Sequence, residues 1–175
     1  MKNTARIIIT TKCLKNCENC SNTKEMLASA MKIKGIPQGY DNYIITGGEP
    51  TLYPDRIAKV IRGVPYGSKV YLQTAMWPYY DEEEGIFSSL DGITYSLHKR
   101  FTSDDINRFD FFQDWAEKHY KKMNLRLFIE KEEETSVCDV CELMEPRLYS
   151  RIVIQAHEPN CPLPINETLF ILEEL

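Results

Sequence analysis

Three cysteines near the start of the chain are close enough in sequence to hold one metal site. Cys13, Cys17 and Cys20 fall within eight residues, in a C-x3-C-x2-C spacing. As thiolates they are soft ligands that suit zinc or an iron–sulfur cluster. A structural zinc site would need a fourth ligand, whereas three thiolates suit a [4Fe–4S] cluster whose fourth iron stays open to a substrate or cofactor. The loop of residues 12–22 is therefore the first candidate site.

A second set of cysteines has a less regular spacing. Cys138 and Cys141 form a C-x2-C pair, and Cys161 follows further along the chain. With a fourth ligand such as His157 they would form an auxiliary iron–sulfur or zinc site. The alternative, which we favour, is that they are free thiols. A third interpretation is that one of them donates a hydrogen atom or an electron during turnover.

Composition limits the classes of function. The chain has 175 residues and a net charge of −5, so we expect one domain and no general nucleic-acid binding. No apolar run approaches the length of a membrane span, and we see no signal peptide. Six cysteines without an export signal indicate a reducing, cytoplasmic location and metal ligation in place of disulfides.

Strand-like and helix-like segments alternate along the chain. Short apolar, β-branched runs predict strands at 5–11, 42–46, 70–74, 93–97, 125–129 and 151–155. Helical spacing predicts helices at 23–34 (capped by Asn22 or Thr23), 55–62, 81–90, about 103–122 (capped by Ser103 or Asp104) and 137–148. In the tail, 158–175, the segment 168–172 is expected to pack as a closing strand or helix.

The connections between the predicted strands are too long for hairpins, which indicates an α/β fold with a parallel sheet. Six units are too few for a full barrel of about 250 residues, so we predict a partial (βα)6 barrel with parallel strands. Functional groups in such sheets gather at the C-terminal ends of the strands. The cysteine loop follows the first strand there, and Gly47-Gly48-Glu49-Pro50 follows the second.

This pair of motifs, in this order and on these strands, resembles the radical S-adenosylmethionine (SAM) superfamily. The resemblance covers residues 1–175 as a minimal, single-domain member. It implies that Cys13, Cys17 and Cys20 hold a [4Fe–4S] cluster whose open iron is chelated by the methionine end of SAM. An electron, supplied by a donor such as flavodoxin or ferredoxin, would cleave SAM to a 5′-deoxyadenosyl radical that abstracts hydrogen from the substrate.

The resemblance also implies which residues contact SAM, although it assigns no catalytic residue beyond the cluster and this site. Gly47 and Gly48 would let the backbone approach the ligand closely. His98 has two interpretations: it contacts SAM, or it is an ordinary exposed histidine at the end of a strand. Asn19 departs from the family, because many relatives carry an aromatic residue before the third cysteine. The expected SAM contacts are Gly47, Gly48, Glu49, Pro50, Thr74, Ser96, His98, Gln155 and Asn19.

Two small subfamilies have comparable length. They are the 7-carboxy-7-deazaguanine synthases, which act on a small molecule, and the activases that install a glycyl radical on a protein partner. The former carry Mg²⁺ beside the cluster loop, where Ser21 or Thr23 would offer a hydroxyl, but Ser21-Asn22 departs from their Asp-Thr. We favour a small-molecule substrate over a protein substrate. A non-catalytic iron–sulfur or zinc binding module is the alternative of another class.

Overall fold

A computed structural model of the chain describes residues 3–15, 17, 20, 22–79, 84–98, 102–130, 144–155 and 163–173. The chain divides into two compact units. The first comprises residues 1–73 and 158–175, and the second comprises residues 74–157. The single domain expected over residues 1–175 stays a prediction.

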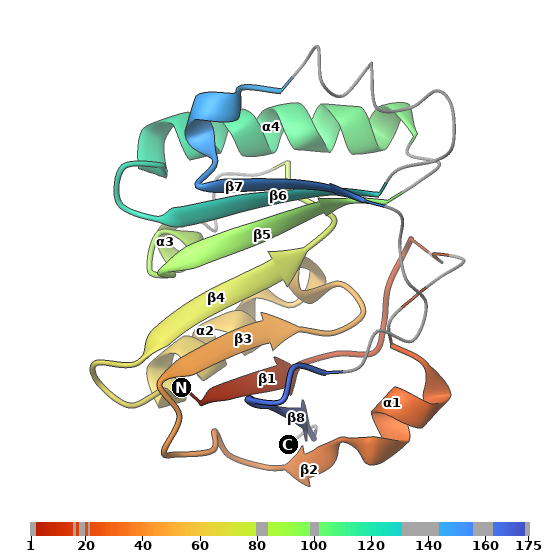
Figure 1. The fold of residues 1–175 in the computed structure, drawn as a ribbon, viewed down its shortest axis with the longest axis vertical. Coiled ribbons are helices and arrows are strands. Elements are labelled where there is room, and N and C mark those ends of the chain that lie inside the picture. The colour runs from red at the N-terminus through yellow and green to blue at the C-terminus, as the bar shows by residue number, and fades with distance from the viewer. Residues whose placement is uncertain are drawn as a thin grey trace. The chain divides into compact units, whose positions relative to one another are not determined.

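The first unit is built on five parallel strands among its described residues (Figure 1). Along the sheet they lie in the order β2-β8-β1-β3-β4. β1 therefore lies between β3 and β8, with Ile7 opposite both Ile45 and Phe170. The tail predicted to be a strand or a helix is the strand β8. The bounds are β1 Thr4–Ile8, β2 Met31–Ile33, β3 Asn42–Thr46, β4 Lys69–Thr74 and β8 Glu167–Leu172.

Helices of the first unit follow the strands that carry the candidate motifs. They are α1 Lys24–Ser29, the 3-10 helix η1 Pro50–Leu52 and α2 Pro54–Gly63. α2 lies behind β3 and β4 in Figure 1, and its apolar positions Ile57 and Val60 are fully buried. The alternating strand residues Ile7, Ile45 and Leu72 are buried as well, so an aliphatic core forms on one face of the sheet.

The helix predicted over residues 23–34 is too long. α1 ends at Ser29, and Met31–Ile33 form β2, which pairs with the end of β8. Two apolar residues flanking Lys32 fit a strand as well as a helix, and the distant pairing partner decides between them. The N-cap is Thr23, whose hydroxyl accepts a hydrogen bond from the Met26 N–H at 3.1 Å.

The second unit has three parallel strands among its described residues, in the order β5-β6-β7. α4 runs along them in Figure 1. Aromatic side chains fill the core between helix and sheet: Phe112 stacks on Tyr95 at 4.6 Å between ring centroids, and Trp77 lies 4.9 Å from Trp115. The bounds are α3 Glu84–Phe87, β5 Gly92–Leu97, α4 Ser103–His119, β6 Asn124–Glu130, the 3-10 helix η3 Pro146–Leu148 and β7 Arg151–Gln155.

α4 begins one residue earlier than either predicted cap allows. Its N-cap is Thr102, not Ser103 or Asp104. The Thr102 hydroxyl accepts from the Asp105 N–H while the Asp105 carboxylate accepts from the Thr102 N–H, which is a capping box. Several neighbouring acceptor side chains fit a helix start, and the backbone geometry selects one of them.

The predicted fold class, α/β with parallel strands that do not close into a full barrel, is confirmed. All six predicted strands are present, each within about three residues of its expected bounds. α3 lies within the helix predicted at 81–90, of which residues 81–83 are outside the described part of the chain. Of the helix predicted at 137–148, only residues 144–148 are described, and they form an irregular segment followed by the 3-10 helix η3. In that described part, no helix has the length and apolar character needed to cross a membrane.

Candidate functional site

The cysteine loop begins where β1 stops pairing as a regular strand. The Ile9 N–H still donates to the Thr46 carbonyl at 3.0 Å, so the chain follows β3 for one residue beyond β1. The Thr10 hydroxyl then accepts from the Lys12 N–H at 3.1 Å and forms a turn. Cys13 directly follows this turn, so the first thiol is placed by the end of a buried strand.

The Gly47–Glu49 turn, which follows β3, is hydrogen-bonded to the segment that leads into the cysteine loop. The Gly48 N–H donates to the Thr10 carbonyl and the Glu49 N–H donates to the Lys12 carbonyl, both at 2.8 Å. A Cβ added at Gly47 would clash with the backbone of Thr10, and one added at Gly48 would clash with the backbone of Lys12. The glycines therefore permit two segments of the chain to approach each other, where the sequence predicted approach to a ligand.

The same turn also holds the far end of the cysteine loop. The side-chain amide of Asn22 donates to the Gly47 carbonyl at 2.5 Å. Asn22 was predicted as a possible helix cap, but Thr23 performs that role and Asn22 faces the turn instead. Both ends of the loop are thus fastened to Gly47–Glu49. This contact was not predicted from the sequence. The only local signal for it is that Asn22, an amide side chain, directly precedes the helix cap Thr23.

Glu49 is a buried carboxylate beneath the loop. Its residue is 1% exposed, and one oxygen accepts from both the N–H and the hydroxyl of Thr51, at 3.1 and 2.8 Å. The side chain also caps η1. These two contacts hold the Glu49 carboxylate in place. Pro50, the last member of the motif, is buried at the start of η1.

In the cysteine loop, Cys13 and Cys20 are exposed and Cys17 is half-buried. Partial desolvation of the Cys13 sulfur raises the pKa of that thiol, the Lys15 N–H lowers it, and the nearby charges of Glu49 and Cys20 raise it further. Binding a metal would displace the thiol protons.

The donor chemistry of the loop fits a soft metal cluster, because three sulfur ligands follow one another on one short segment. Across the described residues, no three His, Cys, Asp or Glu side chains gather closely enough to hold a metal ion. A cluster bound by Cys13, Cys17 and Cys20 would draw the three sulfurs together.

Two further predicted SAM contacts lie in the second unit, on β4 and β5. Thr74 is buried at the end of β4, where its hydroxyl donates to the Met76 carbonyl at 2.7 Å and accepts from the Met76 N–H at 3.2 Å. Its hydroxyl thus supports a local turn. Ser96 lies half-buried on β5, on the opposite face from the buried Tyr95 and Leu97.

His98 follows β5 and pairs with a carboxylate that sequence reasoning missed. The His98 Nδ1 lies 3.2 Å from an oxygen of Glu130, which ends β6 and is 4% exposed. In the parallel register Leu97 is opposite Ile129, and Glu130 is opposite Gln155 of β7. His98, Glu130 and the predicted contact Gln155 therefore share the C-terminal edge of one sheet. The signal for Glu130 was its position directly after a predicted strand.

Several predicted site residues lie outside the described part of the chain. They are Asn19 and Ser21 of the first loop, and Cys138, Cys141, His157 and Cys161 of the second cysteine set. The predictions made for them stay predictions.

A scan against protein-family models and a search of curated proteins both find no match to this sequence.

Proposed function

We propose that this protein is a radical SAM enzyme, in which Cys13, Cys17 and Cys20 hold a [4Fe–4S] cluster. When bound, such a cluster supplies the electron that cleaves SAM and so generates a radical at the 5′ carbon of its adenosyl group. The proposal extends to an external electron donor such as flavodoxin or ferredoxin. It also includes a cytoplasmic location, because reduced thiols and a cluster require a reducing compartment.

One observation carries the proposal: the Gly47–Glu49 turn is hydrogen-bonded to both ends of the cysteine loop. Thr10 and Lys12 accept its N–H groups on one side, and Asn22 donates to it on the other. β1 and β3 are paired neighbours, so their ends lie side by side, and these hydrogen bonds extend that contact into the cysteine loop. The arrangement supports a shared site in which thiols and turn act on one ligand.

The chain's own residues would then divide the work. The three thiolates would bind the cluster, and the loop ends fixed by Gly48 and Asn22 would hold the sulfurs beside the turn. The Gly47 carbonyl and the buried Glu49 would accept hydrogen bonds from the amino group of SAM. An iron-bound amine keeps two N–H donors, and a buried carboxylate is a charged acceptor that would form strong hydrogen bonds with them.

The test is cleavage of SAM by the reconstituted protein. The chain is loaded with iron and sulfide without oxygen, reduced with dithionite and incubated with SAM, and 5′-deoxyadenosine is measured by chromatography. We expect about four irons per chain and formation of 5′-deoxyadenosine. A properly loaded and reduced sample that forms none would overturn the enzyme proposal in favour of a non-catalytic binding module.

Matched cysteine variants separate the two cysteine sets. Cys13→Ala should lose the brown absorbance near ~400 nm, or keep a degraded cluster without SAM cleavage. Cys138→Ala should retain both the brown absorbance and SAM cleavage if Cys138 is a free thiol. About eight irons per chain would show instead that the second set holds another cluster.

The substrate of the proposed reaction is a small molecule, with a glycyl-radical protein as the alternative. An activase should form a stable complex with a much larger protein partner. A small-molecule enzyme should act without one.

A further inference from the structure

A pocket with a volume of about 590 Å³ opens in the first unit at the C-terminal ends of β1 and β8. Its wall includes Thr10, Thr11 and Lys12, which lead directly into the cysteine loop. Its apolar part is formed by Ile9 and Leu172, both buried. A volume of this size suits a small ligand, because such sites typically measure about 300–1,000 Å³.

The charges around this pocket are opposite to the charge of the whole chain. Four cationic side chains, those of Lys12, Lys32, Lys34 and Arg56, line it together with one carboxylate, that of Glu173. The whole chain has 21 Lys and Arg against 26 Asp and Glu. Cations from three separate segments therefore gather around one concave surface in an acidic protein, and their summed field attracts anions.

The four cationic side chains of the pocket differ in whether the protein already binds them. Arg56, which is half-buried on α2, donates from Nη1 to the Ile9 carbonyl at 2.6 Å, and this fixes its guanidinium at the pocket wall. Lys32 lies 3.8 Å from Glu173, a long and exposed ion pair. For the Lys12 and Lys34 ammonium groups, the described residues provide no partner. Two ammonium groups thus remain to bind a ligand.

We propose that this pocket binds a small molecule that carries a phosphate or carboxylate group. Lys12 and Lys34 would contact the anion, Arg56 would add a fixed donor, and Ile9 and Leu172 would contact an apolar part of the same molecule. The anion binding stands on the pocket alone. Its identification as the substrate site rests on the proposed function, since Lys12 directly precedes the cluster ligand Cys13.

The binding test uses the full chain and two defined probes. Inorganic pyrophosphate and citrate represent the phosphate and carboxylate classes, and each is titrated by calorimetry at fixed ionic strength, because added salt screens exposed charges. We expect saturable binding of at least one probe, with one site per chain. The probe that binds more tightly identifies the class of anion.

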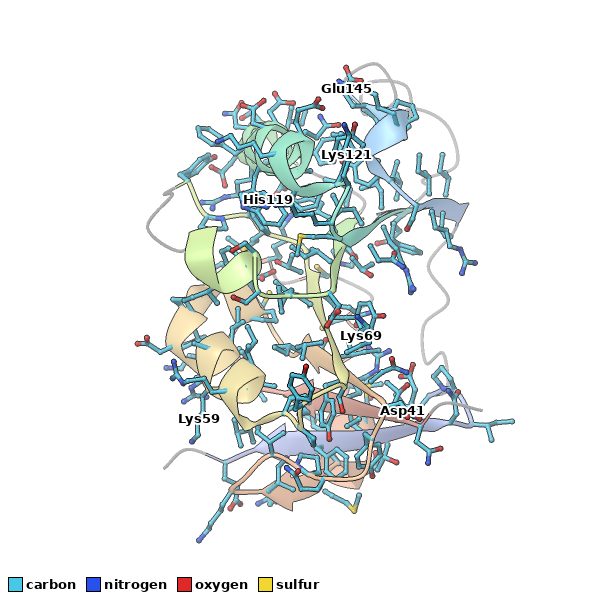
Figure 2. All side chains as sticks on the ribbon, turned by 90° about the vertical axis from the view of Figure 1, so that its left-hand side faces the viewer. Asp41, Lys59, Lys69, His119, Lys121 and Glu145 are labelled. Atoms are coloured by element: carbon cyan, nitrogen blue, oxygen red, sulfur yellow. The ribbon has the colours of Figure 1, made fainter. Side chains whose placement is uncertain are left out.

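A matched pair of variants assigns the binding to the pocket. The double variant Lys12→Gln/Lys34→Gln should weaken binding by at least about tenfold, because each lysine removed costs a charge-assisted hydrogen bond. Lys59→Gln removes one positive charge from the same unit. Figure 2 shows Lys59 projecting outward from α2, and it does not line the pocket, so binding should change less than twofold. Circular dichroism and thermal unfolding check that each variant is folded.

Three outcomes would overturn the proposal. One is that neither probe binds saturably. Another is that Lys59→Gln weakens binding as much as the double variant. The third is that the double variant keeps its affinity for both probes but slows cluster reduction by an acidic electron-transfer protein, which would make this surface a protein-docking site.

The failure of this proposal and the failure of the proposed function give different results. The calorimetry needs neither reduction nor SAM cleavage. Binding without formation of 5′-deoxyadenosine would refute the radical reaction and leave the anion site standing. Formation of 5′-deoxyadenosine without anion binding would support the radical reaction and refute the anion site.

Discussion

The C-terminal strand edges of the two units are built in different ways. In the first unit, backbone groups do most of the work: N–H groups of Gly48 and Glu49 bind carbonyls of Thr10 and Lys12, and glycines make room for this contact. In the second unit, regular strands end side by side and present side chains, with His98 beside the buried Glu130. Beneath the second edge, Phe112 stacks on Tyr95 in the core.

This difference predicts how each edge tolerates change. At the first edge, a side chain added at Gly47 or Gly48 would push apart two backbone segments, and the cysteine loop would move with them. Where side chains meet, one contact can be removed while the strands stay paired. The geometry of the first edge should therefore be more sensitive to substitution than that of the second.

Removing a core ring should have the largest effect on stability. Phe112→Ala should lower the free energy of unfolding by about 4 kcal/mol, because Phe112 is fully buried and stacks on Tyr95. Denaturant unfolding measures this loss. The matched variant Phe111→Ala, one residue away and 48% exposed, should cost much less.

Hydrogen exchange of Phe112→Ala tests whether the two units differ in stability. We expect protection to fall in β5 and β6 and to remain in β1 and β3. An equal fall in both units would show that they unfold together, and the comparison would then describe only local geometry.

Gly48→Val should follow, at about 3 kcal/mol, because its Cβ would clash with the backbone of Lys12. We also expect this variant to retain less iron after reconstitution, since the clash moves the start of the cysteine loop. Gly35→Ala is the control, because a Cβ there meets nothing within 4 Å. A Gly48→Val protein with normal stability and iron content would contradict the role assigned to the turn.

His98→Ala tests the edge that side chains build. It removes a partner from the buried carboxylate of Glu130, and we expect a loss of about 2 kcal/mol, measured by thermal unfolding. His98→Gln keeps a hydrogen-bond donor and should recover part of the loss. Iron content should be unchanged in both variants, and a loss of iron would show that this edge also supports the cluster.

Asn22→Ala should have the smallest effect on stability, about 1 kcal/mol, because it removes a single hydrogen bond to the Gly47 carbonyl. Its effect should be seen in the cluster: the far end of the loop is released, so we expect faster loss of iron to a chelator. Asn22→Asp, which has similar size but no amide donor, should behave in the same way. A chelation rate equal to that of the unmodified protein would remove Asn22 from the site.

Much of the fold could be predicted from the sequence because its strands are short, apolar and β-branched, and this local pattern is enough to mark them. The exception is β2. Its three residues, Met31–Ile33, fit a helix continuing from α1, and they form a strand because β8 lies beside them. A pairing partner more than a hundred residues away leaves no mark on a local pattern.

The candidate site was predictable in its motifs but not in its contacts. The spacing of Cys13, Cys17 and Cys20 indicates ligands directly. The hydrogen bond of Asn22 to Gly47 and the pairing of His98 with Glu130 join segments that are far apart in the chain. Such contacts depend on register and loop path, which composition and periodicity do not specify.

The position of β8 has a consequence for synthesis. β1 is made long before β8, one of its two neighbours, because β8 lies more than 150 residues further along the chain. Until then Ile8 lacks its contact with Leu169, and one edge of β1 has no partner strand. The local contacts of residues 74–157 can form earlier, because contacts close in sequence form faster than distant ones. During translation, the strand that carries the cysteine loop therefore keeps one unpaired edge until β8 is made, and an unpaired strand edge is open to aggregation.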